Sequence, residues 1–177
     1  MVTRIFVEKK QGFQVEAAHL LADLKENLGL AALEEVRILN RYDVDGLTPD
    51  QFYAAARTIL SEPNQDNVYP QGFSLPEEYQ VFAMEYLPGQ YDQRADSAAQ
   101  CVQLLTQGER PQVATAKIIG LKGPLSPKEL NQVKAYLINP VESREASLAM
   151  PHSLALTAPP PANVARVAGF TGWSKEE

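Results

Sequence analysis

The sequence is poor in features that would place it outside a reducing, aqueous compartment. It has a single cysteine among 177 residues, so no internal disulfide can form. No apolar run approaches the roughly 20 residues that a membrane-spanning helix requires. The first seven residues read directly as a strand pattern and lack the layout of a signal peptide. We therefore expect a cytoplasmic protein.

The sequence also lacks the signatures of nucleic-acid binding and of common catalytic sites. Lysine and arginine number 16 against 22 aspartates and glutamates, giving a net charge of -6, and such a chain repels phosphate backbones. It contains no glycine-rich phosphate loop, no nucleophile elbow and no histidine–cysteine spacing typical of metal sites. We expect neither catalysis nor a bound cofactor or metal in this chain.

For each of the isolated side chains that could take part in chemistry, the sequence favours a structural role. His19 lies in an expected helix, where a surface or core histidine is favoured over a catalytic base. Cys101 adjoins an apolar helix face, which favours a buried structural thiol over a nucleophile. Asp43 and Asp45 resemble the start of a calcium loop, but the position of the required glutamate is held by Ala54, so an acidic turn is favoured.

The first half of the chain predicts two strands and two helices. Residues 5–7 and 36–39 have the apolar composition of strands. A helix follows the first strand and should end at Gly29, a suitable C-cap. Thr48, Pro49 and Gln51 form a capping-box pattern that opens the second helix, which should end before Pro63.

The second half repeats this order at an offset of about 78 residues, which is typical of an internal duplication. Residues 81–86 and 113–119 predict strands, and a helix between them should end at Gly108. Ser126 and Pro127 open the last helix, which should end before Pro140.

These patterns predict an α+β fold with pseudo-two-fold symmetry, an antiparallel sheet and helices on one face. We expect a first unit at residues 1–66, a connector at 67–79, a second unit at 80–147 and a linker at 148–177. Ser174 and Glu177 have capping-box spacing, so we expect the chain to be a piece of a longer polypeptide with a following domain. The apolar positions predict one core shared by both units: Phe6, Val7, Leu21, Leu24, Val36, Phe82, Met84, Ala98, Val102, Ile118 and Leu137.

Two segments, residues 85–101 and 136–146, combine chain breakers with dense polar residues. Such polar residues form either a solvated surface or a docking surface, and their absence from the corresponding stretch of the first unit favours docking. The candidate interdomain surface consists of Gln90, Asp92, Arg94, Asp96, Gln100, Glu142, Arg144 and Glu145.

Together these segments resemble the N-terminal domain of large-type phosphoribosylformylglycinamidine synthase, a glutamine-dependent ligase of purine biosynthesis. The resemblance implies a domain built like two fused copies of the small subunit of the multi-subunit enzyme. It also implies that this domain bridges the synthetase and glutaminase domains of the same polypeptide. ATP, magnesium and the glutaminase residues would belong to those other domains.

A different class of function stays open. Two paired α+β units could form a stand-alone module that binds a small effector at their interface.

Overall fold

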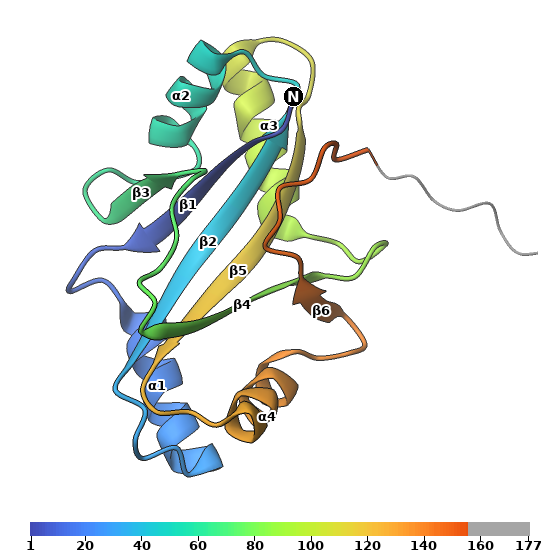
Figure 1. Ribbon diagram of the computed structural model, residues 1–177. Helices are drawn as coiled ribbons and strands as arrows, with labels where there is room; N and C mark the ends of the chain where they lie inside the picture. The colour runs from blue at the N-terminus through green and yellow to red at the C-terminus, as the bar shows by residue number, and fades with distance from the viewer. Residues whose placement is uncertain (156–177) are drawn as a thin grey trace, which may run out of the picture.

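A computed structural model describes residues 1–155 and shows one six-stranded sheet with four helices (Figure 1). The strands are β1 (Thr3–Lys9), β2 (Glu35–Asp45), β3 (Asp66–Pro70), β4 (Tyr79–Tyr86), β5 (Gln112–Lys122) and β6 (Ser143–Ala146). The helices are α1 (Val15–Leu28), α2 (Pro49–Thr58), α3 (Gln93–Thr106) and α4 (Pro127–Leu137). All strand pairs are antiparallel, which confirms the predicted α+β class.

The strand order is β3-β1-β2-β5-β4-β6 and is symmetric about its centre. Each half of the chain contributes three strands, and the first half meets the second where β2 pairs with β5. From either edge, the third strand of a half comes first, then its first strand and then its second strand. This symmetry agrees with the predicted pseudo-two-fold arrangement, while the duplication itself remains a prediction.

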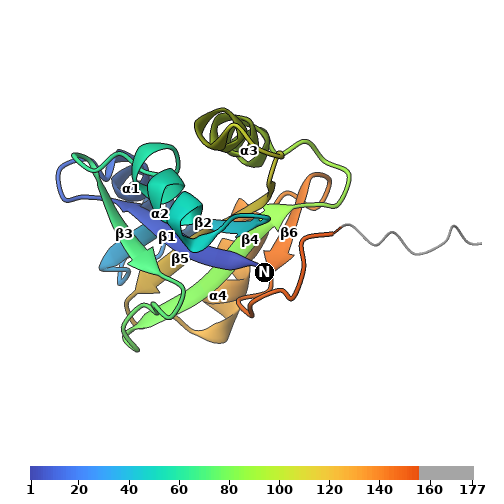
Figure 2. The ribbon, with the colours of Figure 1, turned by 90° about the horizontal axis from the view of Figure 1, so that it is seen from above.

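All four helices pack on one face of the twisted sheet. Figure 2 shows α1, α2 and α3 along the same side of the strands. Successive strand residues point to opposite faces, so alternate positions of a strand meet the helices. Ile38 and Tyr42 of β2 accordingly lie in the two clusters that hold the helices. In Figure 1, α2 and α3 lie at one end of the strands, and α1 and α4 lie at the other.

The predicted helix starts are confirmed. Thr48 and Ser126 accept hydrogen bonds from the backbone of Gln51 and Glu129, and both capping boxes are complete. Gly29 caps α1 in the left-handed conformation, as predicted. The prediction for α3 is off by one residue, because Gln107 (φ 52°) takes the left-handed position before Gly108.

The sequence patterns missed both edge strands. The stretch expected to be a connector contains part of β3, which pairs with β1, and the charge cluster after Pro140 contains β6, which pairs with β4. These strands have five and four residues, too few to show a clear alternation of apolar and polar positions. Residues 156–177, including the expected helix start at Ser174, lie outside the described part of the chain.

The core is shared by both halves, but it is divided between the two faces. Leu24 and Val36 pack with Phe82 on the helix face. Phe6 and Ile118, which we expected in the same core, pack together on the opposite face. They occupy the alternate positions of β1 and β5, so the expectation of a single core is wrong: these residues form a cluster on the face without helices.

The opposite face is crossed by a buried ionic network. Arg4 donates two hydrogen bonds to Asp43, at 2.5 and 2.9 Å, and Arg41 lies 3.3 Å from the same carboxylate. The pKa of Arg41 is lowered mainly by burial. Asp43 is 1% exposed and belongs to β2, so its assignment to an acidic turn is wrong.

Two connecting segments cover this face. Arg4 and Arg41 donate hydrogen bonds to the backbone oxygens of residues 147–149, which hold the chain after β6 against the sheet. From the other side, Leu75 of the β3–β4 connection approaches Gly120 so closely that a Cβ at position 120 would collide with it. The face without helices is therefore covered by connecting segments.

We predict that Leu24→Ala lowers the free energy of unfolding by about 2–5 kcal/mol, because Leu24 is fully buried between both halves. Leu104→Ala, at a helix position that is 72% exposed, is the control and should cost less than about 0.5 kcal/mol. Chemical denaturation should show one transition. Two well-separated transitions would contradict the shared core.

We predict that Asp43→Asn destabilises the protein by about 3–5 kcal/mol, because it leaves the buried guanidinium group of Arg4 without a carboxylate and removes one of the two carboxylates beside Arg41. The matched control is Asp96→Asn, which breaks a pair with Arg110 whose side chains are 40% and 47% exposed. That change should cost far less, because an exposed ion pair contributes little to stability. Thermal denaturation measures both variants. If the two substitutions lower the stability equally, the buried network stabilises the protein no more than an exposed ion pair does.

Candidate functional site

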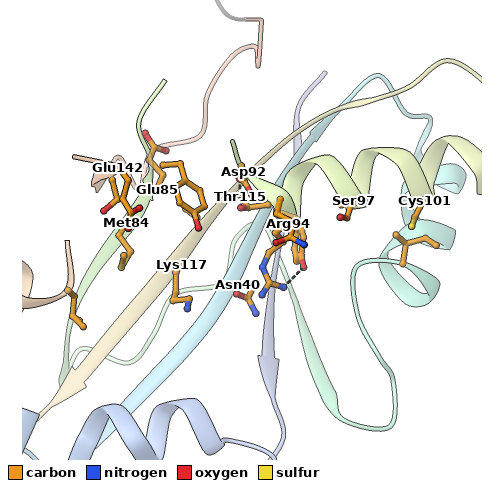
Figure 3. A pocket seen from close by; sticks show the side chains of 18 residues that line it. Asn40, Met84, Glu85, Asp92, Arg94, Ser97, Cys101, Thr115, Lys117 and Glu142 are labelled. Carbon is orange, nitrogen blue, oxygen red and sulfur yellow. Dashed lines mark hydrogen bonds between the residues drawn. The ribbon is translucent and has the colours of Figure 1, made fainter. Parts of the chain in front are cut away.

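The candidate site is an open cavity of about 580 Å³ on the helix face of the sheet (Figure 3). Its floor is formed by central strands, including Asn40 and Tyr42 of β2 and Lys117 of β5. Its walls are the first turns of α3, the end of α4 and the loop before β6. Both halves of the chain thus contribute to one cavity.

The cavity lies where the two pairs of helices leave the sheet uncovered. Asn40 and Lys117 pair at the midpoint of the β2–β5 ladder, so the cavity extends over the junction of the units. A smaller cavity of about 280 Å³ shares Asn40, Tyr42, Ile59 and Arg94 with it. Together the two cavities form a trough across the middle of the sheet.

The two polar segments singled out in the sequence lie side by side. Leu87 donates a backbone hydrogen bond to Glu142 at 2.9 Å, and the Gln90 amide lies 3.4 Å from the Val141 oxygen. Arg144 forms an ion pair with Glu85 at 2.8 Å. Pairing of β4 with β6 thus brings residues that are more than fifty positions apart into one corner of the molecule.

Asp92 fixes the start of α3 above the cavity floor. One carboxylate oxygen caps the helix by accepting from the Ala95 amide at 2.9 Å. The other accepts from the Thr115 hydroxyl of β5 at 2.6 Å. Asp92 therefore orients the helix wall relative to the sheet.

Arg94 belongs to a charged cluster between the units. It donates to the Tyr42 hydroxyl at 3.1 Å, while Lys117 pairs with Glu16 of α1. Burial opposes the charge of Arg94, but the Tyr42 hydrogen bond and the nearby carboxylates outweigh it, so the pKa of Arg94 is raised. The hydrogen bond from Arg94 to Tyr42 and the ion pair of Lys117 with Glu16 each join one half of the chain to the other. Arg94 thus contributes to the contact between units as well as to the cavity.

The remaining candidate residues lie outside the cavity. Asp96 is bound by Arg110 and by the Tyr91 hydroxyl, and Glu145 pairs with Lys134 at 2.7 Å. Gln100 is exposed on α3. Three of the eight candidates, Asp92, Arg94 and Glu142, therefore line the cavity.

Sequence reasoning missed the polar residues of the floor. Asn40 and Lys117 occupy strand positions whose neighbours on the same face, such as Ile38 and Ile119, are apolar. A polar residue in the middle of an otherwise apolar strand face could have indicated this site from the sequence. The expectation that Cys101 is buried is wrong, because the residue is exposed and lines the cavity.

Among residues 1–155, no group of three or more metal-ligating side chains is close enough to hold an ion. Within the same range no helix combines the length and apolar character needed to cross a membrane. In comparisons with known proteins, no family model matches the chain and no curated protein matches it.

We predict that Asp96 titrates at a lower pH than an ordinary aspartate, because hydrogen bonds from Arg110 and then Tyr91 lower its pKa. Its contribution to stability is present above the pKa of the unfolded chain and is lost as the pH falls through the lower folded pKa. Arg110→Ala should raise the Asp96 pKa, measured by NMR titration. Arg57→Ala, which removes an exposed arginine of α2, is the control and should not change it.

Proposed function

We propose that this chain is a non-catalytic assembly domain of phosphoribosylformylglycinamidine synthase. The whole enzyme converts formylglycinamide ribonucleotide to its amidine, using ATP and ammonia released from glutamine. In this proposal the chain contacts the synthetase and glutaminase domains of the same cytoplasmic polypeptide. ATP and magnesium are bound by the synthetase domain.

The observation that carries this proposal is the corner at which the two resembling segments meet. It presents exposed apolar side chains, with Tyr86 49%, Tyr91 70% and Val141 75% exposed. Polar Gln90, Glu142 and Arg144 lie on the same two segments. Such a mixture of aromatic, aliphatic and charged side chains is typical of contacts between domains. We call these six residues the corner surface.

The charged residues of the corner surface also favour a role in contacts with another domain over a role in stabilising this one. Arg144 is 52% exposed, and exposed pairs contribute only about 0–1 kcal/mol to stability. Glu142 makes no ion pair with any described residue. These charged groups are thus available to a neighbouring domain at little cost to this one.

We predict that Arg144→Ala in the complete enzyme lowers glutamine-dependent turnover at least about fivefold, a typical allosteric coupling, and lowers ammonia-dependent turnover less. The reason is that communication between domains is needed only when ammonia must arrive from the glutaminase. Steady-state rates with each nitrogen source provide the measurement. The chain alone should hydrolyse neither glutamine nor ATP.

The matched control is Arg57→Ala, which removes an exposed arginine on α2, away from the corner surface. It should leave both rates unchanged. Equal loss of both activities in Arg144→Ala would indicate a role in building the synthetase site, and no loss would contradict the assembly role of this surface.

A second candidate function, a module that binds a small effector, is favoured by one observation. The cavity lies at the junction of the two units and is lined by both. Pockets of 300–1,000 Å³ are typical of small-molecule sites.

A further inference from the structure

Charged groups of both signs line the cavity. Figure 3 shows Glu142 and Glu85 on one side, Arg94, Asp92 and Asn40 on the other, and Lys117 between them. Arg94 uses one terminal nitrogen for Tyr42, and no described group accepts from its other guanidinium nitrogens. The half-buried Asn40 side chain forms no hydrogen bond with the described residues. Donors for an anionic group therefore gather over the centre of the sheet.

The opposite side of the cavity offers an exposed carboxylate on a backbone that is held in place by hydrogen bonds. The backbone amide of Glu142 donates to Asn139 at 3.1 Å, and its carbonyl accepts from Leu87, so this residue is held at the cavity rim. Its carboxylate has no cationic partner among the described residues. Such a group can accept charge-assisted hydrogen bonds from a ligand ammonium.

The space beside these groups is largely apolar. Met84 and Tyr86 of β4 and Leu137 of α4 line it together with Ala98. This part of the cavity can accommodate a short uncharged side chain. The volume of about 580 Å³ leaves room for a ligand larger than a single small amino acid.

Charge balance decides between classes of ligand. Lys117 and Arg94 bring two positive charges, while the lining residues Glu85, Asp92 and Glu142 and the Lys117 partner Glu16 bring four negative charges. A phosphate dianion would add to a net negative site and is disfavoured. A simple cation would satisfy Glu142 but leave the donors over the sheet unused.

We propose that this cavity binds a small zwitterion of amino-acid to dipeptide size. The ligand carboxylate lies near Arg94, Lys117 and Asn40, and its primary ammonium lies near Glu142. This inference rests on the second of the two functions above and does not depend on the assembly role.

Isothermal titration calorimetry of the full chain with a panel of free amino acids and dipeptides tests the inference. It also distinguishes an amino-acid ligand from a dipeptide ligand. Matched ligands with an acetylated amine or an amidated carboxylate remove one charge each. At least one zwitterion should bind saturably, and each blocked form should bind about tenfold more weakly or worse, as expected for loss of a hydrogen bond to a charged group.

Glu142→Gln and Lys117→Met should each weaken binding by a similar factor. Their controls are Glu109→Gln and Lys128→Met, which change exposed residues outside the cavity. Ser97→Phe, at an exposed position of the cavity wall, should block binding by filling the space. Thermal denaturation of each variant verifies that it is folded.

Failure of every zwitterion to saturate below about 10 mM would overturn the inference. Equal binding of blocked and unblocked ligands, stronger binding of inorganic phosphate, or unchanged affinity in both charge variants would also overturn it. None of these results would affect the glutamine-against-ammonia comparison that tests the assembly role.

Discussion

The fold depends on the pairing of β2 with β5. This antiparallel ladder joins eleven residues of each strand and connects the two halves of the chain through main-chain hydrogen bonds. Each half alone is a three-stranded sheet with two helices, and a domain of that size buries a smaller fraction of its surface than the whole chain does. The ladder places Val36 beside Leu121 and Val44 beside Val113, so that apolar groups from both halves share each hydrophobic cluster.

The same ladder creates the cavity. Helix α1 packs with α4 over one end of it, and α2 with α3 over the other, so none of these four helices covers its midpoint. A solvated strip of sheet can carry polar side chains without the cost of burying them. Asn40 and Lys117 occupy this midpoint, and Glu16 and Arg94 reach it from the first turns of α1 and α3. The symmetry of the backbone thus brings together four side chains whose charges are not symmetric.

Local signals predicted much of this fold, and long-range contacts account for most of what was missed. Thr48, Ser126 and Gly29 act through residues close in the sequence, so their caps could be predicted. Strands β3 and β6 are specified by pairing with β1 and β4, and their own sequences carry little signal. For the site, three of eight proposed residues line the cavity. The remaining lining depends on which strand face meets the helices, a property set by the assembled sheet.

The two faces of the sheet have different roles: one carries the buried ionic network, and the other carries the open cavity. On the face without helices, Arg4 and Arg41 bind both Asp43 and the backbone of residues 147–149, so the segment after β6 covers this face. Had the segment crossed the helix face instead, it would have filled the trough over Asn40 and Lys117. The buried charges cannot exchange their partners with water without a large desolvation cost, which makes the path of this segment specific. An ionic network on one face therefore keeps this segment away from the trough on the opposite face.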